Sequence, residues 1–254
     1  IILAALVGIA SGALIGLING LLIAYVSIPP IVSTLGMLNV VNGIVKFATN
    51  GTWITDIPQN FIDFGQFYLF ETKVEGITSK VGIPVQVLIL IGIALITWVI
   101  LKYTMFGRSV YAFGGSESAA QRIGFNNSRT QLLVYSYMGA ICGVAAFVHV
   151  SIFRQVDPNT FGGYEMQVIA AVVIGGTAVS GGYGSVLGAL LGVAFMSILN
   201  NGLILMRIPT FWHQIVIGMI IIVAVSMDAI NRARLEKNRV IVDIDEADVR
   251  GTIK

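Results

Sequence analysis

Residues 1–45 read IILAALVGIASGALIGLINGLLIAYVSIPPIVSTLGMLNVVNGIV and contain no charged side chain. A helix needs ~20 apolar residues to cross the ~30 Å hydrocarbon core of a bilayer. Two crossings therefore fit into this stretch. They are separated at Pro29 and Pro30, because paired prolines do not allow one helix to continue. Residues 166–206 are uncharged in the same way and predict two further crossings.

The composition of the whole chain is that of a membrane protein. Apolar residues make up 56% of its 254 positions and charged residues only 11%, against ~25% charged residues in soluble domains. We therefore expect an all-α fold, a polytopic transmembrane helical bundle with about seven spans, of which the second and fifth are short. The expected spans are residues 1–26, 30–45, 84–101, 131–150, 166–180, 186–206 and 210–227.

The placement of Lys and Arg predicts the orientation, because basic loops stay on the cytoplasmic side of a membrane. The segment between the third and fourth spans has four basic residues against Glu117 alone, and a second basic cluster follows the last span. Both should be cytoplasmic, so residues 229–254 would form a cytoplasmic tail, whereas residues 46–83 and 151–165 should face outward. The basic residues are Lys102, Arg108, Arg122, Arg129, Arg232, Arg234, Lys237 and Arg239.

The segment between the third and fourth spans contains GGSESAAQRIG, residues 114–124. The double glycine ends the preceding element, and Ser116 is suited to cap a following helix. Glu117 then lies at the positive end of the helix dipole, and Gly124 ends the turn. We predict a two-turn helix outside the bilayer, whose small side chains Ser118, Ala119 and Ala120 let the surface of another protein approach closely.

The residues suggest no catalytic site and no metal site. Cys142 is the single cysteine and lies within a span, which excludes disulfides within the chain and thiolate metal clusters. His149 and His213 have no acidic neighbour inside a span, so we expect both to be interfacial. The glycine-rich run 175–184 lacks the Lys-Ser/Thr of a phosphate loop and predicts a mobile or tightly packed turn. We expect no enzyme activity and no cofactor in this chain.

Two further patterns allow two interpretations each. Gly8, Gly12, Gly16 and Gly20 recur at every fourth position, as do three glycines at 184–192, which indicates either tight helix packing or a face that slides during transport. Pro58 begins a short helix with Phe61, Phe64 and Phe67 or Tyr68 on one face. That helix would rest at the membrane interface or present a docking surface to an extracellular partner.

Five stretches follow one another along the chain in an order that matches a known family. They are IPPIVSTLGM (28–37), GGSESAA with Gly124 (114–124), IAAVVIGGT (169–177), GGYG (181–184) and LNNGL (199–203). Together they resemble the permease subunits of ABC importers for ribose and related simple sugars. The resemblance runs from the first residues to about Asp228.

The resemblance implies a permease subunit that works as a homo- or heterodimer in the bacterial inner (plasma) membrane. It receives a monosaccharide or similar small sugar from an extracytoplasmic binding protein and is driven by two cytoplasmic ATPase subunits, which bind ATP and magnesium. Full-length members have additional N-terminal helices, so residues 1–228 would be an N-terminally incomplete permease domain with its C-terminus in the cytoplasm. The coupling loop of the family matches residues 114–129. Its contacts with the ATPase would involve Gly115, Ser116, Glu117, Ala119, Ala120, Arg122 and Gly124.

A path for sugars needs hydrogen-bonding groups and aromatic faces without strong buried charge. Several polar and aromatic residues within the spans meet this demand, although interhelical hydrogen bonds of this type also serve packing alone. The candidates are Thr34, Asn39, Asn42, Tyr135, Phe147, Asn200 and Asn201.

Several other functions stay open at this point. A permease of the same superfamily for a sugar-like signalling molecule, a branched-chain amino acid or a nucleoside is the nearest alternative. An amino acid, with its carboxylate and ammonium, would want stronger complementary polarity than these spans contain. An intramembrane enzyme would need a converging nucleophile, metal or acid–base pair. A passive channel would leave the helix at 116–124 without a purpose.

Overall fold

The computed structural model describes residues 1–72, 81–179, 181–209, 212–213, 215–220, 222–223, 225–226 and 230. It divides the chain into two compact units, Ile1–Gly162 and Gly163–Lys254, which we call unit 1 and unit 2. The predicted seventh span, 210–227, lies partly outside the described residues. The predicted cytoplasmic tail and its basic cluster lie outside them except for residue 230.

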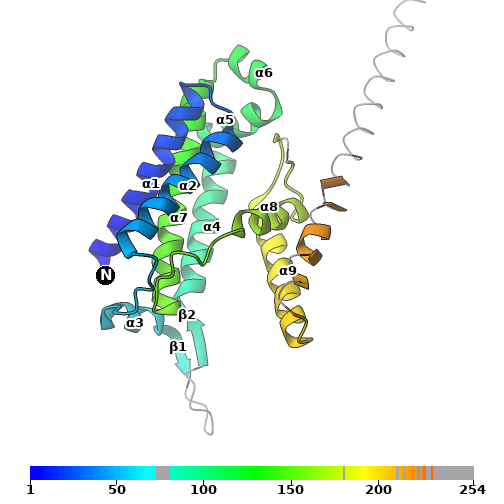
Figure 1. Ribbon diagram of the computed structural model, residues 1–254. Coiled ribbons are helices and arrows are strands. Elements are labelled where there is room, and N and C mark those ends of the chain that lie inside the picture. The colour runs from blue at the N-terminus through cyan, green and yellow to red at the C-terminus, as the bar shows by residue number, and fades with distance from the viewer. Residues whose placement is uncertain are drawn as a thin grey trace, which may run out of the picture. The chain divides into compact units, whose positions relative to one another are not determined.

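Unit 1 contains most of the helices (Figure 1). A short antiparallel hairpin, β1–β2, joins α3 to α4 and pairs Tyr68 with Pro84. In chain order the elements of unit 1 are α1 (Ile2–Ala24), α2 (Pro30–Thr49), α3 (Gln59–Gly65), β1 (Tyr68–Thr72), β2 (Val81–Pro84), α4 (Val85–Tyr103), α5 (Met105–Gly115), α6 (Glu117–Arg122) and α7 (Asn127–Phe153). Unit 2 contains α8 (Tyr164–Ile174) and α9 (Val186–Leu205).

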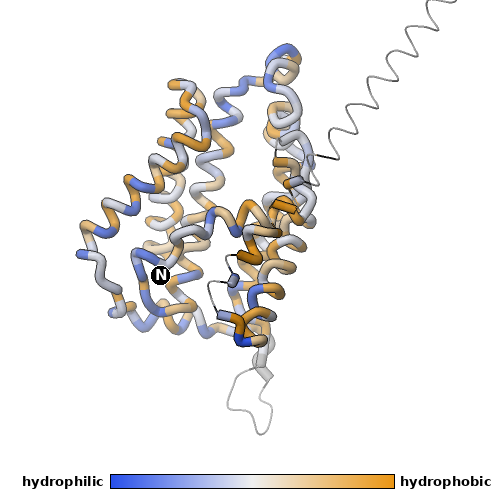
Figure 2. Tube along the Cα trace, turned by 45° about the vertical axis from the view of Figure 1, so that its right-hand side comes forward, coloured by the Kyte–Doolittle hydropathy of each residue, from blue (hydrophilic) through white to orange (hydrophobic). Residues whose placement is uncertain are grey.

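Five of these helices, α1, α2, α4, α7 and α9, are long and apolar enough to cross a membrane. Hydrophobic residues run along them with few hydrophilic interruptions (Figure 2). The prediction of a polytopic helical membrane protein is therefore confirmed. The hairpin β1–β2 is an addition that the hydropathy pattern does not contain.

The fifth predicted span differs from the structure. We expected a helix over 166–180, but α8 has 11 residues and ends at Ile174. The reason is local, because Gly175 is its C-cap and Gly176 has a φ of +82°, a left-handed conformation that ends helices. The second span is longer than predicted, since α2 continues to Thr49 and stops at Asn50, where φ is +52°.

The glycines of α1 lie against the backbone of α7. A Cβ atom on Gly12 would overlap the carbonyl oxygen of Gly139, and one on Gly16 would overlap that of Tyr135. From the other side, a Cβ on Gly143 would overlap the carbonyl oxygen of Gly8. The two helices thus touch backbone to backbone, as small residues at helix interfaces in membranes allow. Of the two interpretations of this ladder, tight packing is the arrangement observed.

The second glycine ladder has the same role inside unit 2. Cβ atoms on Gly188 and Gly192 of α9 would overlap the carbonyl oxygens of Gly175 and Ala171. Beside this contact lies a small buried cluster of Ala170, Ala171, Met196 and Ile217. The two ends of the run 175–184 are tightly packed, because a Cβ atom on Gly175 would overlap the Gly188 carbonyl oxygen and one on Gly184 would overlap the Thr177 side chain.

The basic and the acidic loops of unit 1 lie at opposite ends of its helices, as the charge pattern predicts. Beside the turn after α1 lies the start of α7, where the Ser128 hydroxyl donates to the Ala24 carbonyl at 3.3 Å. At the opposite end, Ile54 and Val156 exchange two backbone hydrogen bonds of 3.0 and 2.9 Å. The segment with α6, predicted to be cytoplasmic, is at one end of unit 1, and α3 with the hairpin β1–β2, predicted to face outward, is at the other (Figure 1). Which end faces the cytoplasm stays a prediction.

The short helix α3 begins after Pro58, as predicted. Its aromatic face packs on α7, since the ring centroids of Phe61 and Phe64 lie 5.4 and 5.2 Å from that of Phe147. A Cβ atom on Gly65 would overlap the Ser151 carbonyl oxygen. These two rings therefore anchor the helix to its own chain, whereas Phe67 is exposed. A docking surface on α3 stays a prediction.

Candidate coupling site

The helix α6 and the turn around it form the candidate coupling site. Ser116 closes α5 and opens α6, because its backbone N–H donates to the Ala112 carbonyl at 3.0 Å and its hydroxyl accepts from the Ala119 N–H at 3.3 Å. The predicted N-cap is confirmed, and α5 ends at the double glycine as expected. One serine thus makes the elbow between two helices.

The other end of α6 is closed by Gly124, which has a φ of +92°. The N–H of Phe125 donates to the Ala120 carbonyl at 3.1 Å, and that of Gly124 donates to the Gln121 carbonyl at 3.1 Å. This pair of bonds is a Schellman motif, which favours glycine at the left-handed position. The predicted role of Gly124 in ending the helix is confirmed.

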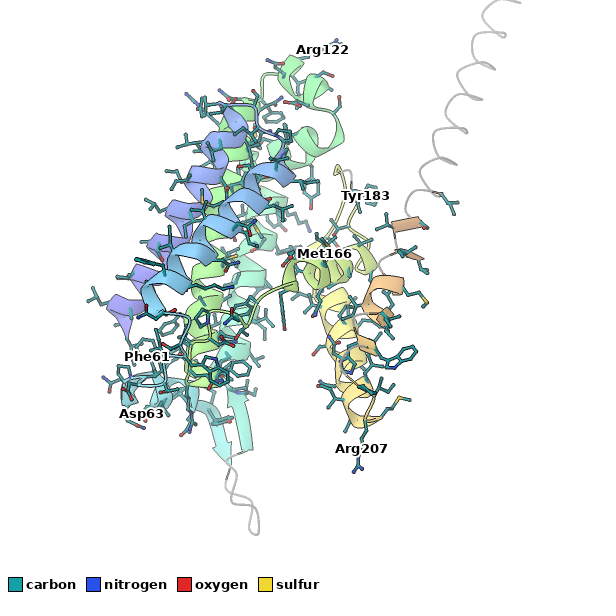
Figure 3. The ribbon with its side chains drawn as sticks, viewed as in Figure 1. Phe61, Asp63, Arg122, Met166, Tyr183 and Arg207 are labelled. Carbon is teal, nitrogen blue, oxygen red and sulfur yellow. The ribbon has the colours of Figure 1, made fainter. Side chains whose placement is uncertain are left out.

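Most of α6 is open to a partner. Glu117, Ser118, Ala119 and Arg122 are exposed, and Arg122 lies at the tip of unit 1, far from Phe61 and Asp63 at the opposite end (Figure 3). Ala120 differs from the expectation. Only 1% of its surface is accessible, so in this structure it packs on its own chain and contributes no surface to a partner.

The first turn of α7 holds the elements around it through side chains. The amide nitrogen of Asn127 donates to the Glu117 carbonyl on α6 at 3.0 Å. The Thr130 hydroxyl donates to the hydroxyl of Ser109 on α5 at 3.2 Å, and both residues are buried. With the bond from Ser128 to the end of α1, this one turn reaches three other helices.

Sequence reasoning missed these three bonds. Ser, Thr and Asn side chains at a helix start are ordinary capping signals, and nothing in their spacing identifies Ser109 or Glu117 as partners. Asn126, the actual N-cap of α7, follows the usual pattern, because its side-chain oxygen accepts from the Arg129 N–H at 3.0 Å.

The end of unit 1 that bears α6 is basic. Lys102, Arg108, Arg122 and Arg129 are all exposed there. The ammonium of Lys102 lies 4.8 Å from the ring of Trp98 and 5.4 Å from that of Tyr103. A lysine beside aromatic rings at the end of an apolar helix is typical of a membrane–water boundary.

Three of the candidate path residues lie on α2. The hydroxyl of Thr34 and the amide of Asn39 bond to carbonyls of their own helix, to Pro30 at 2.9 Å and Leu35 at 3.0 Å. Asn42 is half-buried. Thr34 and Asn39 are therefore accommodated without a second helix, as polar side chains in membrane helices often are.

The remaining path candidates are spread over both units. Phe147 serves packing, since it holds the rings of α3, and Tyr135 lies where its backbone contacts Gly16. In unit 2, Asn200 is half-buried and Asn201 is exposed. Within unit 1 the structure gathers no single cluster from these candidates.

Two polar pairs between helices were missed. The Ser33 hydroxyl donates to the side-chain oxygen of Asn19 at 3.4 Å, joining α2 to α1. The hydroxyls of Thr97 and Tyr137 lie 2.7 Å apart and join α4 to α7. Asn19 had a usable signal, because it is an asparagine inside an uncharged span, as are the four asparagines that were predicted to line the path.

His149 lies among aromatic rings. His149 stacks on Phe153 at 4.4 Å and meets the edge of Phe161 at 4.9 Å. Within the described part of the chain, no group of three His, Cys, Asp or Glu side chains is placed to hold a metal ion.

Comparison with known proteins identifies the family. The family described as branched-chain amino acid transport system / permease component matches residues 1–225. The chain belongs to this permease family. The predicted identity as a permease component is thereby confirmed, and an intramembrane enzyme is excluded.

Curated relatives are import permeases. The chain is 34% identical to the ribose import permease of Escherichia coli K12 over 221 residues, which are 87% of this chain and 66% of that protein. It is 37% identical to the ribose import permease of Bacillus subtilis 168 over 212 residues, 83% of this chain and 62% of that protein. It is 33% identical to the autoinducer 2 import system permease of Photorhabdus laumondii over 228 residues, 89% of this chain and 65% of that protein.

The chain thus spans slightly less than two thirds of the length of these curated relatives. No solved structure matches it.

Proposed function

We propose that the chain is the transmembrane permease of an ATP-driven importer, and that α6 is its docking element for a cytoplasmic ATPase. The observation that carries this proposal is the construction of α6. A six-residue helix is closed at both ends by its own caps, presents Glu117, Ser118 and Ala119 to solvent, and lies at the basic end of unit 1. Such a rigid, small-surfaced helix fits into a groove of a partner.

The proposed cargo is a monosaccharide or a similar neutral, hydroxylated molecule. The five long helices contain no Asp or Glu, and their polar pairs are hydroxyls and amides, such as Asn19 with Ser33 and Thr97 with Tyr137. Uncharged groups suit sugar hydroxyls, whereas the ammonium of an amino acid would want a carboxylate partner. Ribose and autoinducer 2 in the names of the relatives agree with this class.

The description of the family favours a second candidate cargo, a branched-chain amino acid. We rank it lower because of the missing membrane carboxylates. Asn42, Asn200 and Asn201 remain proposed path residues, while Phe147 is better explained by packing.

The proposed partners follow from the two ends of unit 1. The ATPase, which carries the ATP and magnesium, binds around Ser116, Glu117, Ala119 and Arg122. An extracytoplasmic binding protein delivers the cargo at the end bearing α3, and a second permease subunit completes the path. In this arrangement the C-terminus is cytoplasmic and the membrane is the bacterial inner membrane.

The test is uptake by the full-length permease reconstituted in vesicles with its ATPase and binding protein. We expect labelled ribose to enter only when both the ATPase and ATP are present. Entry without the ATPase would contradict the proposal and indicate a channel. ATP-dependent uptake of labelled leucine but not ribose would replace the proposed cargo with the branched-chain amino acid.

A further inference from the structure

We propose that Asn127 is the positioning residue that fastens the coupling helix α6 to the long helix α7, so that movement of α6 reaches the membrane spans. This inference rests on the proposed function, because it assigns the part of unit 1 that would transmit work from the ATPase. It concerns a residue outside the docking surface itself.

The local bonds of α6 do not by themselves tie it to a membrane helix. Its N-terminal cap, Ser116, and its C-terminal turn at Gly124 and Phe125 are contacts within residues 112–125. They make α6 rigid and connect it along the chain to α5. Besides these bonds, α6 is held by the burial of Ala120 and by the short connection 123–126 to α7. A directional bond from α7 to the first turn of α6 would secure the end of α6 that these contacts leave free.

Asn127 makes such a contact. Its amide nitrogen donates to the Glu117 carbonyl at 3.0 Å, ten residues earlier in the chain. A carbonyl oxygen has two lone pairs, so this bond adds to the helical bond that Glu117 accepts inside α6. It therefore holds the backbone of the first turn of α6, the turn whose exposed side chains, Glu117 to Ala119, are proposed to contact the partner.

The position of Asn127 on α7 makes the contact mechanically useful. Asn127 and Thr130 are three residues apart and so share one face of the helix. The first bonds α6 and the second bonds Ser109 of α5. The elbow between α5 and α6 is thus held to α7 on both sides of Ser116.

From its first turn, α7 carries the connection to the rest of unit 1. The hydroxyl of Tyr137 bonds Thr97 of α4, and Gly139 and Gly143 lie against the backbone of α1. At its far end Phe147 holds the rings of α3. A displacement that Asn127 passes to α7 therefore reaches α1, α4 and α3 through direct contacts.

The bond to Glu117 fixes the orientation of the Asn127 amide. Its side-chain oxygen is buried and has no hydrogen-bond partner among the described residues, so the nitrogen makes the amide's one directional contact seen here. An aspartate at this position would place a carboxylate oxygen against the Glu117 carbonyl and remove the donor.

The experiment compares two neighbouring isosteric substitutions in the full-length permease, assembled with its ATPase and binding protein. Asn127→Asp removes the donor. Asn126→Asp is the control for the added charge, because the oxygen of the exposed Asn126 caps α7 and both changes place a negative charge at the same helix N-terminus. Asn127→Ala is the control for burial of a carboxylate, because it removes the donor and adds no charge. We expect Asn127→Asp to lower the sugar transported per ATP hydrolysed about tenfold, the effect of losing one well-placed bond. We expect Asn126→Asp to stay within about twofold of wild type.

The inference is overturned if Asn127→Asp keeps the wild-type ratio, if Asn126→Asp lowers it equally, or if uptake and ATP hydrolysis fall together with their ratio unchanged. Asn127→Ala, which introduces no charge, gives the same reading if the aspartate lowers the yield of complex. Hydrogen exchange at α6 in the permease alone supplies a readout without transport, and we expect about tenfold faster exchange in Asn127→Asp only. Lack of ATP-dependent uptake in the wild-type complex would instead count against the proposed function, whatever the exchange data show.

Discussion

The long helix α7 holds its neighbours in two different ways. Along its middle, Gly139 and Gly143 meet the glycines of α1 with no side chain between the backbones. At its first turn, Asn127, Ser128 and Thr130 each reach another element through a single hydrogen bond. The first kind of contact is spread over many atoms and tolerates no added volume. The second consists of separate directional bonds. We call the backbone contact of Gly139 and Gly143 with α1 the scaffold. We call the three hydrogen-bonding residues of the first turn, Asn127, Ser128 and Thr130, the joint.

The largest effect on transport is expected from a change on the exposed surface of α6, which the joint holds to α7. Glu117→Arg should abolish ATPase binding and sugar uptake, because it puts a cation at the positive end of α6 and on the proposed contact surface. The measurement is co-purification of the ATPase with the permease. Asp63→Arg is the control, since Asp63 is exposed on α3 at the opposite end of unit 1. Normal ATPase binding by Glu117→Arg would remove α6 from the docking surface.

The scaffold should respond to the addition of a single methyl group. Gly139→Ala places a Cβ atom on the Gly12 carbonyl and should lower the free energy of unfolding by about 2 kcal/mol, as overpacked sites do. Gly92→Ala is the control, because a Cβ on Gly92 of α4 meets nothing within 4 Å. There the higher helix propensity of alanine should leave stability unchanged or raised by up to about 1 kcal/mol. Equal stability of the two variants in thermal unfolding would show that α1 and α7 are not in backbone contact.

A single substitution in the joint should lower the free energy of unfolding less than Gly139→Ala does. Thr130→Val keeps the shape of the side chain and removes the hydroxyl, whose hydrogen is shared between Ser109 and the Asn126 carbonyl of its own helix, which should cost about 1 kcal/mol of unfolding free energy. A double-mutant cycle with Ser109→Ala isolates the pair. An interaction energy of zero in that cycle would mean that α5 is not held to α7 at this point.

The smallest effect is expected between two spans. Tyr137→Phe removes the hydroxyl that lies 2.7 Å from that of Thr97 and should lower stability by about 0.6 kcal/mol, the average for hydrogen bonds between membrane helices. Tyr25→Phe, at an exposed position after α1, serves as control. A loss as large as that of Gly139→Ala would contradict the claim that one hydrogen bond between spans contributes less to stability than the glycine contact of α1 with α7.

Local signals predicted the candidate site better than its surroundings. The cap by Ser116 and the turn at Gly124 follow from residue types next to each other in sequence, and both are present. The burial of Ala120 and the grip of Asn127 on Glu117 depend on how α6 folds back on its own chain. No spacing in the sequence contains that information.

In the spans, too, local sequence signals predicted the helices but not the contacts between them. Hydropathy located α1, α2, α4, α7 and α9, because crossing a bilayer demands length and apolarity alone. The early end of α8 follows from Gly175 and Gly176, a helix-ending pair visible in sequence to which the hydropathy count gives no weight. The partner of the α3 rings, Phe147, lies more than 80 residues away in the chain, so only the fold brings it to them.

The proposed function requires that α6 faces the cytoplasm and is covered there by the ATPase. The most direct measurement is labelling of Ser118→Cys by a membrane-impermeant thiol reagent, in a full-length permease in which Cys142, the single cysteine of these 254 residues, and every cysteine outside them are replaced by alanine, because Ser118 is exposed. The account predicts labelling in inside-out vesicles, protection when the ATPase is added, and none in right-side-out vesicles. Labelling from the outer side of right-side-out vesicles would contradict it.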